Sequence, residues 1–171
     1  MSLTLMMTLI ATPPAAVEHE PQLVRILSYV DVAVTREALD AVAATPQALE
    51  AIARDPRLAR YPRMRAASAL GHYAEAGRAL VGLLETPELD RAVRIQAMSS
   101  LTYVDGARAI DRLRSRLGDA DPELRAAAVR NLGRIDAPRA QAVLRDRLER
   151  GVERVPWVAA ELSRVVARRA N

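Results

Sequence analysis

The chain has 171 residues, about the length of one domain, and half of these residues are hydrophobic. It contains no cysteine, which excludes disulfides, thiolate catalysis and cysteine-ligated zinc. The net charge is +4 and the pI is near 10.3. The sequence contains no lysine, so all 25 of its strongly basic side chains are arginines. Residues 86–171 hold 17 arginines against 12 acidic residues, which favours either an acidic partner or a solvated surface of Arg–acid pairs.

Residues 1–17 form an apolar N-terminal segment. Residues 3–11 are apolar except for two threonines, and a Pro-Pro-Ala-Ala stretch follows over 13–16. This pattern resembles a signal peptide, although no positive charge precedes it and the cleavage site is poor. A signal peptide, a disordered tail and an apolar lid on the first repeat are all open interpretations. Cleavage would place the protein in the periplasm or outside the cell, and an uncleaved segment would keep it in the cytoplasm.

Three helices are predicted before the repeats. Pro21 begins a helix that runs to about residue 30, because apolar residues recur there at spacings of three and four. Thr35 caps a helix over 36–44, and Thr45 followed by proline opens a helix over 46–54. These helices match the repeats poorly, as expected of a terminal unit that caps an apolar stack.

One segment recurs three times at a fixed spacing. Its copies start at Arg63, Arg94 and Arg125, and in each a leucine follows seven residues later. The spacing of 31 residues is typical of stacked helical repeats and not of a single globule with a pocket.

Each repeat is predicted to contain a first helix and a second helix. First helices are expected over 62–74, 88–103 and 122–134. Second helices are expected over 76–85, 106–117 and 138–150. A last helix over 156–169 corresponds to the first helix of a further repeat. No linker interrupts this series, so residues 18–171 are predicted to form one helical repeat domain.

The third repeat indicates why its helices should begin and end where they do. Asp121 is a helix cap, and an apolar stripe at every fourth position runs from Leu124 to Leu132. Arg125 lies four residues after the cap and can pair with it. Gly133 is expected to close the helix in a left-handed turn.

Residues 121–136 begin Asp-Pro-Glu-Leu-Arg and end Asn-Leu-Gly-Arg-Ile-Asp. This stretch resembles a HEAT repeat of the short variety named after the phycobilisome lyases, and the resemblance covers 60–150 well, 151–171 partly and 18–58 weakly. It implies an all-α, right-handed α-solenoid of stacked antiparallel helix pairs, with second helices lining a concave face. The family is used mostly for protein binding. Some members are lyases or adaptors, and a related group acts on alkylated DNA.

No catalytic, cofactor or metal site is predicted. His19 and His72 are the only histidines, and the sequence places no convergent ligands beside them. The acidic residues stand at helix caps or four residues from arginines, and the seven glycines form no phosphate-binding loop.

The candidate partner-binding residues are arginines of the second helices and the single tryptophan. They are Arg108, Arg112, Arg116, Arg139, Arg145, Arg147, Arg150 and Trp157. The first three recur every four residues and so share one helix face. Such a face can bind an acidic protein surface or nucleic acid, or it can pair with acids such as Asp111 on the same helices. Trp157 either anchors a partner or closes the end of the core.

These observations favour a non-catalytic scaffold or adaptor that binds another protein, with an acidic protein surface as the expected partner. A nucleic-acid-binding module of the same fold is the first alternative. A lyase-type enzyme or enzyme subunit is the second. No transmembrane segment is predicted.

Overall fold

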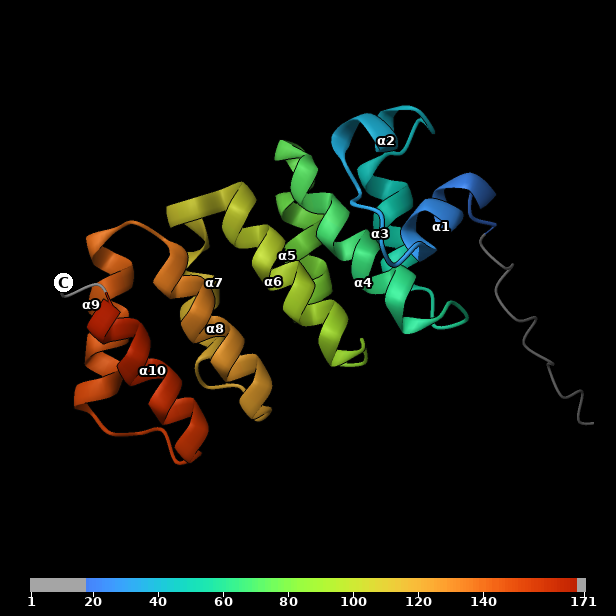
Figure 1. Cartoon of the computed structure of the whole chain (residues 1–171). Helices are drawn as coiled ribbons and strands as arrows, with labels where there is room; N and C mark the ends of the chain where they lie inside the picture. The colour runs from blue at the N-terminus through green and yellow to red at the C-terminus, as the bar shows by residue number, and fades with distance from the viewer. Residues whose placement is uncertain (1–17, 169–171) are drawn as a thin grey trace, which may run out of the picture.

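Helices form all regular secondary structure of residues 18–168, the part of the chain that the computed structural model describes. They are arranged in two layers that run along the molecule (Figure 1). No helix in this part of the chain is both long and apolar enough to cross a bilayer. Residues 1–17, for which a signal peptide, a tail and a lid are the competing interpretations, lie outside the described residues.

Three short helices precede the repeats, close to their predicted positions. They are α1 (Pro21–Ser28), α2 (Arg36–Asp40) and α3 (Pro46–Arg54). Thr35 and Thr45 are caps as predicted, since each hydroxyl oxygen accepts a hydrogen bond of 3.2 Å from a backbone amide three residues later. The helix predicted over 36–44 ends earlier, at Asp40, because the chain turns through Ala43 with a φ of 49°.

The first helices of the repeats form one layer, which faces the viewer in Figure 1. They are α4 (Arg60–Ala69), α6 (Arg91–Asp105), α8 (Pro122–Arg134) and α10 (Pro156–Arg168). The second helices form the other layer, together with α3. They are α5 (Gly77–Glu85), α7 (Ile110–Arg116) and α9 (Pro138–Glu149). Three short 3-10 turns connect the layers: η1 (Leu70–His72), η2 (Ala74–Ala76) and η3 (Gly106–Ala109).

Successive first helices pack directly against one another, and they do so more closely than the second helices. The layer of α4, α6, α8 and α10 is therefore the more closely packed of the two. The expectation that the second helices line a concave face stays a prediction.

Leucines at equivalent positions of the repeats form the core between the layers. Leu70, Leu101 and Leu132 recur every 31 residues, and all three are fully buried. Ala66 and Ala97 recur at the same spacing and are buried beside them. Such small side chains let neighbouring helices approach closely. The burial of Leu132 confirms the predicted register of the third repeat.

The first two repeated arginines tie each first helix to the helix that precedes it. The Nε atom of Arg63 donates a hydrogen bond of 3.2 Å to the carbonyl oxygen of Ala53. The Nε atom of Arg94 makes the same bond, also at 3.2 Å, to the carbonyl oxygen of Leu84. A carbonyl at a helix end lacks its helical partner, so these arginines satisfy acceptors that the fold would otherwise leave open.

The third repeated arginine has a different partner from the one predicted. Arg125 donates to both carboxylate oxygens of Glu153, at 2.9 and 2.8 Å. The predicted partner, Asp121, instead accepts a hydrogen bond of 2.8 Å from a backbone amide in the first turn of α8. It also forms an ion pair of 3.4 Å with Arg91 of the preceding repeat. Because the Asp121 carboxylate binds the start of α8 and Arg91, Arg125 pairs instead with Glu153 in the loop before α10.

Gly133 does not form the left-handed turn that the sequence predicts. It lies within α8, and the described glycines with positive φ are Gly106 and Gly151. A Cβ atom at position 133 would lie 2.3 Å from Cγ1 of Val165 on α10. Glycine is needed here because α8 and α10 approach closely, not because the backbone turns.

Candidate functional site: a groove on the first helices

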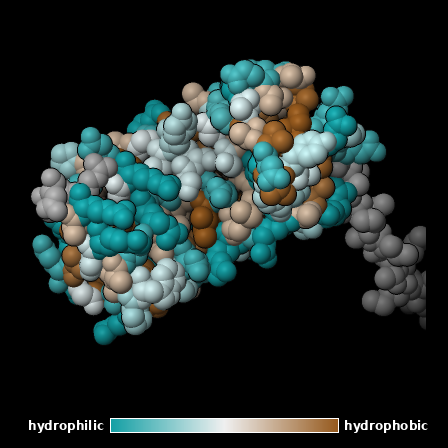
Figure 2. All heavy atoms as spheres, viewed as in Figure 1, coloured by the Kyte–Doolittle hydropathy of each residue, from teal (hydrophilic) through white to brown (hydrophobic). Residues whose placement is uncertain are grey.

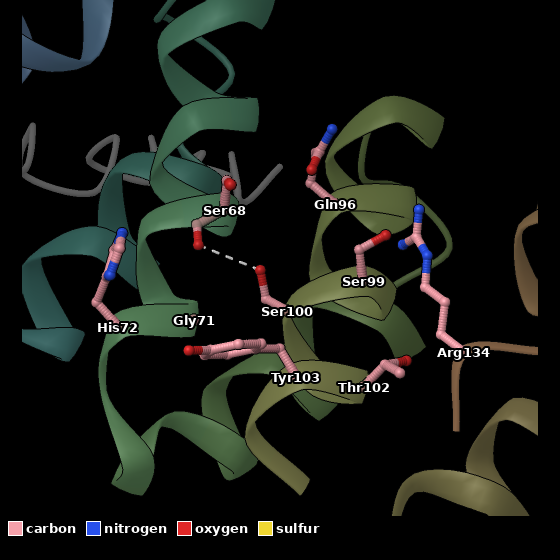
Figure 3. A pocket seen from close by; sticks show the side chains of 9 residues that line it. All are labelled: Ser68, Gly71, His72, Gln96, Ser99, Ser100, Thr102, Tyr103 and Arg134. Atoms are coloured by element: carbon pink, nitrogen blue, oxygen red, sulfur yellow. Dashed lines mark hydrogen bonds between the residues drawn. The ribbon is translucent and has the colours of Figure 1, made fainter. Parts of the chain in front are cut away.

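A groove of about 580 Å³ opens on the layer of first helices, across α4, α6 and α8 (Figure 3). We call it the first-helix groove. Its lining is mostly small or polar and consists of Ser68, Gly71, His72, Gln96, Ser99, Ser100, Thr102, Tyr103 and Arg134. No aspartate or glutamate is among these residues. The volume lies within the range typical of binding sites in proteins.

Small side chains at the contact between α4 and α6 form the floor of the groove. The hydroxyl of Ser100 is buried and donates to the carbonyl oxygens of Ala67 and Ser68, at 3.0 and 3.2 Å. A Cβ atom at Gly71 would already lie 3.4 Å from the Ser100 oxygen. The two helices therefore meet with little side-chain volume between them, and the space above this contact stays open.

Three lining residues occupy equivalent positions near the ends of successive first helices. His72, Tyr103 and Arg134 follow one another at the 31-residue spacing. Within residues 18–168, Tyr103 is the most exposed of the large hydrophobic side chains, with 82% of its surface accessible. Its ring extends from α6 toward the side on which His72 lies, while Arg134 approaches from the opposite side (Figure 3). Nε2 of His72 lies 2.9 Å from the carbonyl oxygen of Val34, which steadies that wall.

The groove becomes positively charged toward α8 and α10. Arg134 is exposed, and its hydrogen bond to the side-chain oxygen of Asn131 is long, at 3.4 Å. Arg130 lies one turn earlier on α8, half-buried, and has no acidic partner among residues 18–168. Arg164 on α10 is paired with Glu161. Figure 2 shows hydrophilic side chains gathered over α8 and α10 and paler ones over the middle of the molecule.

The predicted second-helix arginines lie mainly on the other layer, where most of them meet acidic residues. Six ion pairs join Arg108 to Asp105, Arg112 to Glu85, Arg116 to Asp119, Arg139 to Asp111, Arg147 to Glu153 and Arg150 to Asp146. Arg145 is exposed and has no acidic partner in the described part of the chain. The pairs compensate much of the positive charge of this surface.

A second hollow, of about 420 Å³, lies between α5 and the turn that leads into α7. Arg108 and Arg112 line it together with Arg78, and so do the acidic residues Glu75 and Asp105. Because charges of both signs share its wall, this hollow offers no uniform field to an anionic ligand.

Trp157 lies in the first turn of α10, with 45% of its surface exposed. The next residue, Val158, is buried and takes the core position. Trp157 is therefore partly covered at the end of the stack, and part of its indole is accessible to a partner.

His19 has a partner that the sequence does not predict. Its Nε2 lies 2.8 Å from Oδ2 of Asp55, and both side chains are almost fully buried. The Arg57 guanidinium beside Asp55 holds the pKa of that carboxyl well below its usual range. This cluster holds the chain before α1 against the end of α3. Within residues 18–168, no three side chains of the metal-ligating types are grouped closely enough to hold an ion.

The first-helix groove is not predicted from the sequence, because the predicted binding residues lie mainly on the second helices. A usable signal is nevertheless present in the repeats. The leucines stay the same from copy to copy, whereas the position two residues after each leucine changes from His72 to Tyr103 to Arg134. A position that varies in chemistry while its neighbours keep the core is typical of a surface that contacts something outside the repeat.

A comparison with protein families supports the repeat assignment. A family model described as HEAT repeats matches residues 78–163, which is half of the chain. The matched stretch runs from α5 into α10 and includes α6 and α8, which form one side of the groove. No curated protein matches the chain.

Proposed function

Because the chain belongs to the HEAT repeat family, we propose that it is a non-catalytic scaffold or adaptor that binds a partner protein in the first-helix groove. HEAT repeats commonly mediate interactions between proteins. Repeat stacks present extended surfaces to their partners, and in this chain the groove lies on the closely packed layer of first helices.

The observation that carries the proposal is the exposure of Tyr103 within the groove. Tyrosine is enriched among residues that dominate binding energy, because it contributes a large contact area together with a hydroxyl group. With 82% of its surface accessible, Tyr103 has most of that area available to a partner. Its ring extends beside Gly71 toward His72 (Figure 3) and is covered little by the surrounding fold.

The rigidity of the groove floor also supports binding. The Ser100 hydroxyl fixes α6 to α4 through hydrogen bonds to two carbonyl oxygens of α4. A surface that is already in its binding geometry loses less conformational freedom on association. The groove is therefore suited to a flexible segment of a partner protein, which becomes ordered when it binds.

The two alternatives from the sequence have less support. A nucleic-acid interface on the second helices would need free arginines, but six of the seven are in ion pairs. A lyase-type enzyme would need convergent reactive groups, and the groove offers hydroxyls, one amide, one imidazole and one guanidinium without an acid. Arg145 and Trp157 stay candidates for further contacts outside the groove.

Photo-crosslinking in the cells that make the protein tests the proposal. A photoreactive amino acid replaces Tyr103, and in a matched control it replaces Arg145 on the other layer. Both sites are exposed, so neither replacement disturbs the core. We expect a defined protein adduct from position 103 and none from position 145. Adducts from position 145 alone, or adducts with nucleic acid from position 103, would contradict the proposal.

A further inference from the structure

We infer that the first-helix groove takes a segment of partner protein with an acidic end, whose carboxylates bind Arg130 and Arg134. The inference rests on the proposed function and adds the chemistry of the partner. It follows from how charge is distributed along the groove.

Arg134 offers an accessible guanidinium at one end of the groove. Its hydrogen bond to Asn131 is 3.4 Å long, and its side chain is exposed. Arg130 lies four residues earlier and therefore on the same face of α8. Neither arginine has an acidic partner among residues 18–168. The planar guanidinium fork matches the geometry of a carboxylate, which makes this end of the groove suitable for glutamate or aspartate side chains.

The positive end continues onto α10. Gly133 and Val165 lie against each other where α8 packs on α10. Their neighbours in the chain, Arg134 and Arg164, therefore flank the same contact. Arg164 is paired with the buried Glu161, so part of its charge is compensated, while Arg168 follows one turn later and is exposed. Long-range attraction of an acidic segment toward this end is the expected consequence.

Among the described residues, no arginine lines the other end of the groove. Ser68 and His72 line it, beside the Tyr103 ring, whereas Ser99 lies on the side of α8 and accepts a hydrogen bond of 3.5 Å from the Asn131 amide (Figure 3). These groups can bond to the main chain of a partner segment or pack against small side chains. The occupant therefore changes along its length, from an uncharged end near α4 to an acidic end at α8.

This uneven charge separates a protein segment from a nucleic acid. A nucleic-acid backbone is negative along its whole length, and its binding depends on arginines or lysines that follow it throughout. The half of the groove near α4 lacks them. A protein segment can carry acidic residues only in the part that lies beside the arginines and be uncharged elsewhere. Such a segment therefore matches the charge of the groove better than a nucleic acid does.

The probe is a fluorescently labelled peptide. One half of it contains serine, alanine and leucine, and the other half contains glutamate. Two versions are made, one with the glutamates at the N-terminal end and one with them at the C-terminal end. Fluorescence anisotropy with the full chain measures its dissociation constant at low and physiological salt. Comparison probes are the same peptides with glutamine in place of glutamate, and a short DNA duplex. We expect the glutamate peptide, in at least one order, to bind more tightly than the glutamine peptide and the duplex, and to weaken with salt.

Two matched variants locate the binding. Arg134→Gln should weaken the glutamate peptide about tenfold, because it removes one charged partner from the contact. Arg145→Gln removes the same charge from the other layer and should leave the affinity unchanged. Circular dichroism melts of both variants check that each remains folded, and position 134 is exposed, so we expect no loss of structure.

Three outcomes would overturn the inference: equal binding of the glutamine peptide, tighter binding of the duplex, or an equal loss from Arg145→Gln. Failure of the inference is distinct from failure of the proposed function. If crosslinking at Tyr103 yields a protein whose crosslinked segment is not acidic, the groove is the binding surface but the assigned chemistry is wrong.

Discussion

At the scale of single residues, arginine side chains have three different kinds of partner in this chain. Arg63 and Arg94 bond to backbone carbonyls and hold neighbouring helices together. Arg125 is part of a buried ion pair with Glu153. Arg134 faces the groove, and no acidic residue within 18–168 pairs with it. An abundance of arginine therefore says little about function until the partner of each side chain is known.

The pair between Arg125 and Glu153 makes a prediction about acid stability. Hydrogen bonds from Arg125, a backbone amide and Arg147 lower the pKa of Glu153 from 4.5 to about 2. The charged form is favoured in the folded state, so this carboxylate contributes stability above pH 4.5, and the contribution is lost as the pH falls toward 2. Glu153→Gln should lower the free energy of unfolding by on the order of 3 kcal/mol near neutral pH. The variant should also lose less stability than the original chain when the pH is lowered.

Urea unfolding at about pH 6 and about pH 3 measures this effect. Asp146→Asn is the control, because Asp146 and Arg150 form an exposed pair worth less than about 1 kcal/mol. If Glu153→Gln and the original chain lost stability equally between the two pH values, the pair would not hold the lowered pKa that we describe.

The repeat register makes a second prediction. Leu132 is fully buried, so Leu132→Ala should cost about 2–5 kcal/mol through lost burial and the cavity left behind. Leu148→Ala on α9 is the comparison, because that leucine is 36% exposed and its truncation should cost less than about 1.5 kcal/mol. Chemical unfolding compares the two. A loss within about 0.5 kcal/mol for Leu132→Ala, typical of surface sites, would mean that the register is wrong.

At the scale of the helices, the close approach of α8 and α10 depends on Gly133. Gly133→Ala would bring a methyl group to 2.3 Å from Val165, so α10 must shift or its side chain must change rotamer. We expect a loss of about 1–3 kcal/mol. Gly71→Ala is a matched control, since its new Cβ would lie 3.4 Å from Ser100, and its effect should be under about 1 kcal/mol. Equal thermal stability of the two variants would contradict this account of α8 and α10.

Helix boundaries are also where the sequence was most informative. α3 and α8 begin and end at the predicted residues, because Thr45 and Asp121 are strong caps followed by proline. The partner of Arg125 and the role of Gly133 could not be predicted in the same way. Both depend on how repeats sit against one another, and that contact involves residues about 30 positions apart.

At the scale of the whole molecule, the first-helix groove could not be predicted from the sequence. The amphipathic pattern of a helix shows which face is buried, but not how closely the helices of each layer pack. The first helices are more closely spaced than the second, with small residues such as Ala97 and Ser100 at their contacts. The groove and its exposed Tyr103 follow from this spacing.

The central claim is that the first-helix groove, and not the arginine surface of the second helices, binds the partner. Isothermal titration of the partner recovered at position 103 tests it most directly, with two double variants of the full chain. Tyr103→Ala with Arg134→Ala should weaken binding about tenfold or more, equivalent to at least about 1.4 kcal/mol. Arg112→Ala with Arg145→Ala should leave the affinity within about threefold. A larger loss from the second pair than from the first would contradict the claim.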